Sequence, residues 1–144
     1  MIKEFRYYLD NNFVRKGSLD VAKAKALIKK AEGRIKFSIK SRQINEETAP
    51  YVFEDIYECL REASQALMSL EGYKPYSHEA IISFLKEFYD FKEYDIDSFN
   101  RYRILRNKSV YGGEKISIGK CKEALHFLHT FLPKIKKEFV KSNK

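Results

Sequence analysis

The chain has 144 residues, of which 44% are hydrophobic and 33% charged, a composition typical of one globular domain with a polar surface. It is long enough to bury a core without disulfides or metals, and no apolar run approaches the roughly 18 residues of a membrane span. The first ten residues include charged Lys3, Glu4 and Arg6, so no signal-peptide core is expected. Cys59 and Cys121 lack the spacing of a metal site or a disulfide framework. We predict a cytoplasmic protein with a single domain over residues 1–144.

The charges are divided into blocks along the chain, whose formal net charge is +8. Residues 15–42 carry ten basic and two acidic side chains, residues 46–99 have a net charge of −9, and residues 100–144 have one of +9. If the two basic segments lie side by side, they form a positive surface suited to phosphates or to an acidic partner. An acidic helix packed between them would neutralise that surface, and lysine-rich helix faces also serve solubility. The charge pattern leaves both interpretations open.

Hydrophobic spacing predicts helices along most of the chain. Residues 2–14 form a short amphipathic segment that Gly17 interrupts, and Ser18 is expected to cap the next helix. Apolar residues then recur at intervals of three and four from position 21 to position 35. Residues 35–39 also alternate like a strand, but no alternating segment nearby can pair with them, so the sequence favours a helix there.

The clearest helix begins near Pro50, which suits a first helical turn, and carries an apolar stripe over residues 53–70. Gly72 can end this helix in a left-handed conformation. Lys74-Pro75 then prevents its continuation.

Three further helices are predicted in the second half of the chain. Ser77 is expected to cap the first of them, Asp95 or Asp97 the second, which runs into the glycine pair at 112–113, and Ser117 the third. Four or five main helices with short links predict an all-α, antiparallel up-and-down bundle.

Three stretches of the chain resemble the HEPN superfamily. The central helix pair of that family is similar to residues 57–85, which read YECLREASQALMSLEGYKPYSHEAIISFL. Its polar-motif helix, turn and closing helix resemble residues 103–125, RILRNKSVYGGEKISIGKCKEAL, and the start of prokaryotic and archaeal members resembles residues 13–32, FVRKGSLDVAKAKALIKKAE. The resemblance covers most of the chain in order and implies a HEPN-like helical bundle.

The resemblance also implies a range of functions. Many HEPN domains are metal-independent endoribonucleases or RNA-binding modules, often encoded beside a minimal nucleotidyltransferase as a toxin–antitoxin pair, and others bind nucleotides or partners without apparent activity. We therefore expect a homodimer that binds RNA or a nucleotide, or acts with a minimal nucleotidyltransferase partner, and that uses neither a metal nor another cofactor.

The ribonuclease motif of the family is an arginine, usually followed by a polar residue, with a histidine four to six residues further along. Arg106 and Asn107 match its first half, but Tyr111 stands at the histidine position. An unperturbed tyrosine has a pKa near 10, so it is a poor base at neutral pH, although it can donate a hydrogen bond or act as an acid. The resemblance implies Arg106, Asn107 and Tyr111 as catalytic candidates. It implies Arg103, Arg106 and Lys108 as candidates for binding phosphate or RNA.

A structural role is the alternative for the same residues. Arg103 and Arg106 share one face of the predicted helix, where they can pair with carboxylates such as those of residues 54–62. Positions 106 and 111 point about 140° apart in a regular helix, so their convergence requires the helix to end near Gly112 or a second subunit to contribute. Two functions stay open: a HEPN-type binding module, which the missing histidine favours, and a metal-independent endoribonuclease that uses Arg106 with Tyr111.

The remaining candidates have simpler explanations. His126 and His129 lie beside the apolar stripe that contains Cys121, which indicates a core thiol and flanking histidines in place of a zinc site. His78 follows the predicted cap and is interpreted as a helix-start residue. The abundant tyrosines can stack on unpaired bases, but a bundle without tryptophan needs many of these rings in its core.

Overall fold

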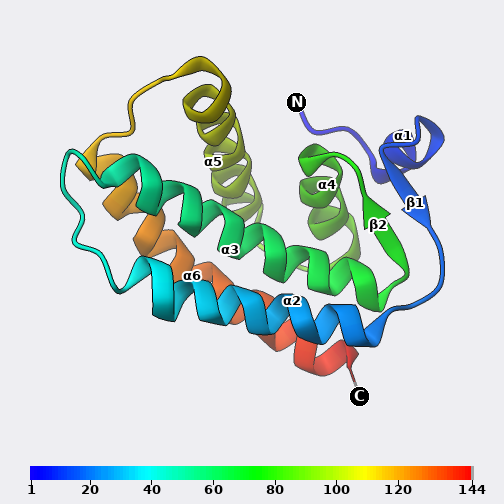
Figure 1. Ribbon diagram of the computed structural model, residues 1–144. Coiled ribbons are helices and arrows are strands. Elements are labelled where there is room, and N and C mark those ends of the chain that lie inside the picture. Colours follow the sequence, from blue (N-terminus) through cyan, green and yellow to red (C-terminus); the bar gives the residue numbers. More distant parts are fainter. Residues whose placement is uncertain (144) are drawn as a thin grey trace.

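Helices make up most of the computed structural model, which describes residues 1–143 (Figure 1). The elements in chain order are α1 (Phe5–Asp10), β1 (Val14–Lys16), α2 (Val21–Arg34), the π-helical turn η1 (Ile35–Ile39), α3 (Ala49–Leu70), β2 (Tyr73–Pro75), α4 (His78–Phe88), α5 (Glu93–Gly112) and α6 (Ile118–Ser142). The predicted all-α bundle is confirmed, and residues 35–39 are helical as expected.

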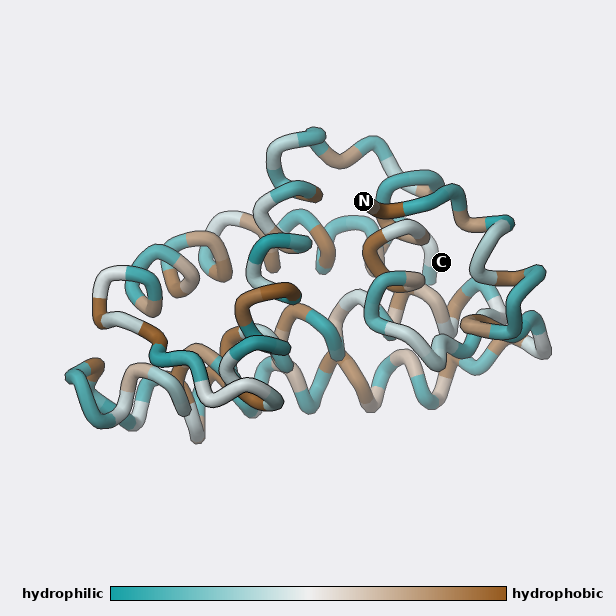
Figure 2. Tube along the Cα trace, turned by 90° about the horizontal axis from the view of Figure 1, so that it is seen from above, coloured by the Kyte–Doolittle hydropathy of each residue, from teal (hydrophilic) through white to brown (hydrophobic). Residues whose placement is uncertain are grey.

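Helix α3 is the centre of the bundle, because it contacts α2, α4, α5 and α6. Its predicted apolar stripe is buried, with Phe53, Leu60 and Leu67 fully inaccessible to solvent. In Figure 1, α2 and α6 lie along α3, whereas α4 and α5 stand across it. Figure 2 shows hydrophobic segments alternating with hydrophilic ones along the long helices, as expected for helices that each bury one face.

The acidic helix α3 lies against both basic helices, α2 and α6. Arg34 of α2 donates two hydrogen bonds of 3.0 Å to Glu62, which is only 1% exposed, and a third of 3.0 Å to Asp55. Arg42 also pairs with Asp55. Part of the basic surface is therefore neutralised by α3, in agreement with the interpretation in which an acidic helix packs between the two basic segments.

The short strands are the main feature that the sequence pattern did not predict. The amphipathic segment expected over residues 2–14 is helical only over α1, and β1 pairs antiparallel with β2, with Val14 opposite Pro75 and Lys16 opposite Tyr73. Three residues are too few to show the alternation typical of a strand, and the partner strand is distant in sequence. Strand β2 is followed directly by α4.

Two predicted helix caps are wrong. Helix α2 is capped by Asp20 and not by Ser18, since the Asp20 carboxylate accepts a hydrogen bond of 2.9 Å from the backbone N–H of Lys23. Helix α5 begins at Glu93, before Asp95 and Asp97, with Lys92 as its N-cap residue. An N-cap residue comes immediately before the first helical turn, whereas Asp95 lies within the first turn of α5, where it is buried and accepts a hydrogen bond of 2.7 Å from Lys134 Nζ of α6.

Other predicted ends are confirmed. The Ser117 side chain accepts a hydrogen bond of 3.0 Å from the backbone N–H of Lys120 at the start of α6. Gly72 and Gly113 follow α3 and α5 with φ of 83° and 69°, the left-handed conformation that favours glycine. Within residues 1–143, no helix combines the length and apolarity needed to cross a membrane.

Candidate functional site

A cavity of about 330 Å³ lies between α5 and the junction of β2 with α4. One wall comes from the β2–α4 junction and the other from α5; the lining residues are Tyr76, Ser77, His78, Glu79, Arg103, Arg106, Asn107 and Tyr111. We call this the Arg106 cavity. Four of the five residues predicted from the sequence, all except Lys108, are thus brought together.

The end of α5 explains why Arg106 and Tyr111 converge although their positions diverge on a regular helix. Helix α5 stops at Gly112, and Gly113 caps it in the left-handed conformation, so Tyr111 lies on the last turn. The Arg106 guanidinium carbon is 5.8 Å from the centre of the Tyr111 ring and 5.7 Å from that of Tyr57 on α3. Both rings are at the distance of a cation–π contact.

Among the described residues, Arg106 makes only long polar contacts. Its Nη2 is 3.5 Å from Glu58 Oε1, its Nη1 is 3.5 Å from Asn107 Oδ1, and its buried Nε has no hydrogen-bond partner among the described residues. Charge-assisted hydrogen bonds are ordinarily about 2.7–2.9 Å long. The guanidinium therefore keeps most of its donor capacity unused, in contrast to Arg34 with its three bonds of 3.0 Å.

Glu58 is held mainly by another arginine. Arg61 donates to Glu58 Oε2 from Nε at 2.8 Å and from Nη2 at 2.6 Å. Burial opposes ionisation of Glu58, but these hydrogen bonds and the charges of Arg61 and Arg106 outweigh it, so its pKa lies below the usual value. The carboxylate thus remains charged, with Oε2 bound by Arg61, whereas its buried Oε1 has only the 3.5 Å contact with Arg106 among the described residues.

Arg103 combines a structural contact with a place on the cavity wall. Its Nε donates to Asn100 Oδ1 at 2.9 Å, and its Nη2 is 3.6 Å from Glu79 Oε1. The predicted pairing with carboxylates therefore exists for both arginines, with Glu58 of α3 for Arg106 and with Glu79 of α4 for Arg103. Only the first of these partners lies in the segment 54–62.

His78 is the site residue that sequence reasoning missed. It begins α4 and lines the Arg106 cavity, and its Nδ1 is 3.0 Å from the Tyr57 hydroxyl. Burial and the nearby charges of Arg61 and Arg106 lower its pKa, so the imidazole is neutral at neutral pH. Burial raises the pKa of Tyr57, so the hydroxyl beside it keeps its proton. A histidine is therefore present beside Arg106, but it comes from α4 and not from the motif helix.

The other candidates lie elsewhere. The Lys108 side chain lines a separate hollow of about 260 Å³, with Ile104, Lys120 and three other residues, and so does not reach the Arg106 cavity. Cys121 is buried, whereas His126 and His129 are exposed. In the described part of the chain, no three His, Cys, Asp or Glu side chains gather as a metal site requires.

Comparison of the chain with protein-family models, with curated proteins and with solved structures gave no match. The HEPN resemblance therefore stays a prediction from the sequence, and the functional interpretation depends on the geometry of the Arg106 cavity.

Proposed function

We propose that the Arg106 cavity binds a phosphate group of single-stranded RNA or of a nucleotide. This proposal rests on the surroundings of Arg106. The guanidinium lines a cavity, its polar contacts are 3.5 Å long, and its buried Nε has no hydrogen-bond partner in residues 1–143. A phosphate offers the oxygens that a planar guanidinium binds most strongly. Arg103 on the same wall adds a second positive charge, which the Glu79 carboxylate at 3.6 Å offsets in part.

Two exposed aromatic rings extend the proposal from phosphate to nucleic acid. Tyr76 is 55% exposed and Tyr111 is 79% exposed, and both line the cavity. An exposed ring beside an arginine offers a surface on which an unpaired base can stack, whichever base it is. We therefore expect the protein to bind single strands with little preference for their base sequence.

The predicted homodimer and the minimal nucleotidyltransferase partner remain proposals that rest on the resemblance. The surface of α5 around Ile104, which is 41% exposed, offers a place for a second copy. Such a dimer would place two Arg106 cavities in one assembly.

The binding proposal is tested by titrating a fluorescein-labelled oligouridylate of about twelve nucleotides with the purified protein and following its anisotropy. We expect binding that weakens as sodium chloride rises from about 50 to 200 mM, because each phosphate contact releases counterions. Unlabelled nucleotide should compete for the same site. Absence of binding by both RNA and nucleotide at the lowest salt would overturn the proposal.

A second candidate function, metal-independent RNA cleavage, is favoured by one further observation, the neutral His78 imidazole on the cavity wall. If His78 Nδ1–H donates to the Tyr57 hydroxyl, Nε2 is left as a base. His78 Nε2 would take the proton of the ribose 2′-OH while O2′ forms a bond to the adjacent phosphorus. The bond from phosphorus to O5′ would break, with a proton supplied to O5′ by the Tyr111 hydroxyl. The charge that develops on the phosphate would be held by Arg106.

This reaction gives a 2′,3′-cyclic phosphate and a 5′-hydroxyl, which can be resolved by gel electrophoresis and mass spectrometry. We expect cleavage in EDTA that is abolished by Arg106→Ala and by His78→Gln. No cleavage by the wild-type protein, or cleavage that neither substitution affects, removes this function and leaves RNA binding to be judged by the titration.

A further inference from the structure

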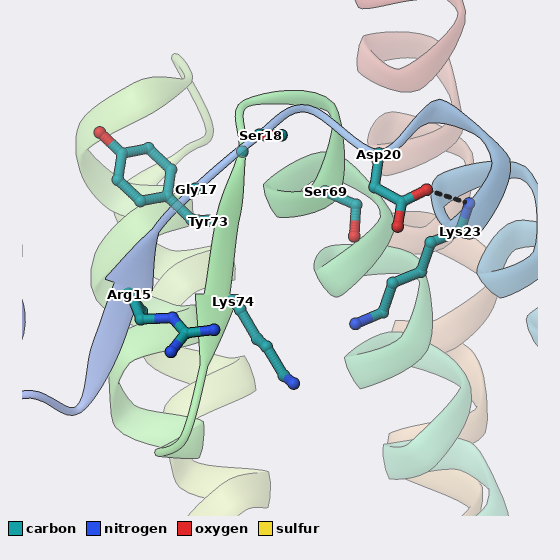
Figure 3. Close-up of a pocket in the computed structure, with 9 residues that line it drawn as sticks. Arg15, Gly17, Ser18, Asp20, Lys23, Ser69, Tyr73 and Lys74 are labelled. Atoms are coloured by element: carbon teal, nitrogen blue, oxygen red, sulfur yellow. Dashed lines mark hydrogen bonds between the residues drawn. The ribbon is translucent and has the colours of Figure 1, made fainter.

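A second cavity, of about 180 Å³, lies where β1, β2 and the start of α2 meet (Figure 3). Its lining residues are Arg15, Gly17, Ser18, Asp20, Lys23, Ser69, Gly72, Tyr73 and Lys74. We call it the Arg15 cavity. Neither the sequence motifs nor the proposed function of the Arg106 cavity uses it.

Three positive side chains from three different elements surround this cavity. Arg15 belongs to β1, Lys23 to α2 and Lys74 to β2, and Figure 3 shows their charged ends turned toward the same space. None of the three takes part in the ion pairs of residues 1–143. The single carboxylate, that of Asp20, is engaged by the N–H of Lys23, so positive charge predominates. Unpaired cations that converge from separate elements favour an anionic ligand.

A hydroxyl group on the cavity wall fits the same kind of ligand. Ser69 is only 6% exposed, its side chain lines the cavity, and none of the hydrogen bonds drawn in Figure 3 involves it. Ser64, one turn earlier on the same helix, instead donates its hydroxyl proton to the Leu60 carbonyl at 2.7 Å. The Ser69 hydroxyl lies on the cavity wall, where a phosphate oxygen would accept its proton.

Backbone hydrogen bonds fix the segments around this cavity. The Gly17 N–H donates to the Gly72 carbonyl at 2.6 Å, and a Cβ at Gly72 would lie 2.5 Å from the Gly17 oxygen. The Asp20 N–H donates to the Ser69 carbonyl at 3.0 Å, which ties the start of α2 to the end of α3. The charged side chains therefore extend from a fixed frame.

The two cavities are connected by β2. Lys74 lines the Arg15 cavity and Tyr76 lines the Arg106 cavity, and Lys74 Nζ is 5.7 Å from the centre of the Tyr76 ring. At about 3.3 Å per residue, residues 72–76 span about 13 Å, which is short enough for one strand of nucleic acid to contact both cavities. The exposed Tyr76 ring, on the wall of the Arg106 cavity and near Lys74, is a place where a base can stack.

We propose that the Arg15 cavity is a second phosphate-binding site, which holds the backbone of the same single-stranded RNA that the Arg106 cavity binds. This inference rests on the proposed RNA-binding function. It extends the contact surface from α5 across β2 to the start of α2.

The test is a titration of ¹⁵N-labelled protein with an oligouridylate of about twelve nucleotides, followed through backbone amide shifts. Shifts at Gly17, Lys23 and Ser69 together with shifts at Arg106 and Asn107 support both sites. Shifts only in the second group leave the proposed function standing and overturn the second site. Shifts in neither group overturn both.

The salt dependence of RNA affinity tests whether the lysines of the Arg15 cavity contact phosphate. Lys23→Ala and Lys74→Ala should each reduce the slope of log affinity against log salt by about 0.7, the value for one lost contact to a single strand. Lys137→Ala removes the same charge from an exposed position on α6 and should leave the slope unchanged. All three lysines are exposed, so the variants are expected to fold, which thermal melts will check. Equal slopes for the three variants would overturn the second site.

Discussion

Replacing Arg106 by alanine separates a binding role from a structural one. The substitution removes two polar contacts of 3.5 Å and two contacts with aromatic rings, those of Tyr57 and Tyr111. An ion pair as long as that with Glu58 contributes about 0–1 kcal/mol, and the two cation–π contacts together contribute about 1 kcal/mol. Glu58 keeps its two hydrogen bonds from Arg61, both to Oε2, while its buried Oε1 loses the 3.5 Å contact with Arg106. We expect the free energy of unfolding to fall by about 1–2 kcal/mol.

The expected effect on RNA affinity is larger. A hydrogen bond to a charged group contributes about 1.5–3 kcal/mol, so its loss should raise the dissociation constant roughly 10- to 150-fold. The affinity is measured by fluorescence anisotropy at low salt, and the stability by urea unfolding followed by circular dichroism.

The matched control is Arg101→Ala. Arg101 is exposed on the same helix and lines the hollow that also contains Lys108, so its loss removes the same charge without changing the Arg106 cavity. An equal loss of affinity in both variants would show that binding follows total charge. A fall in stability of about 3–5 kcal/mol for Arg106→Ala would show that Arg106 is a core ion-pair residue, and either result would refute the reasoning.

Three further predictions follow from contacts in the fold and on its surface. Arg34→Ala leaves Glu62 buried without its two strongest hydrogen bonds, so urea unfolding should show a loss of about 3–5 kcal/mol, and a loss below about 1 kcal/mol would contradict this. Because the pKa of His78 is lower in the folded chain, the unfolded chain binds more protons in acid, and the His78 contribution to stability is present above its ordinary pKa of about 6.5 and lost below it. The melting temperature of His78→Gln should therefore fall less than that of the wild type between about pH 6.5 and 5. Equal falls in the two proteins would argue against a neutral, buried imidazole. Ile104→Glu should convert the proposed dimer to a monomer in light scattering after size-exclusion chromatography, and a wild-type protein that is monomeric at every concentration would remove the dimer.

Features that depend on neighbours in sequence were predicted well. The apolar spacing of residues 53–70 indicated α3, and the left-handed conformation of Gly72 followed from its place after that helix. Ser117 was recognised as a cap because the capping bond joins residues only three apart. Asp20 was missed because Ser18 and Asp20 are both good caps, and the choice between them depends on the bond from Asp20 N–H to Ser69 on α3.

Contacts between distant segments were not predictable in this way. The pairing of Val14 with Pro75 joins segments too short to show strand periodicity. His78 reaches the cavity only because the start of α4 packs beside α5, and nothing in its local sequence distinguishes it from an ordinary helix-start residue.

By its residue spacing alone, the sequence determined a helical chain with most of its helix boundaries and a polar face on α5, because these depend on interactions within a few residues. Only the tertiary structure decided which arginines are available to a ligand. Arg34 and Arg106 are both arginines on long helices, yet one is enclosed by two carboxylates at 3.0 Å and the other faces a cavity with contacts of 3.5 Å. That difference arises from how α3 meets α2 and α5, and distances between packed helices are set by the whole core.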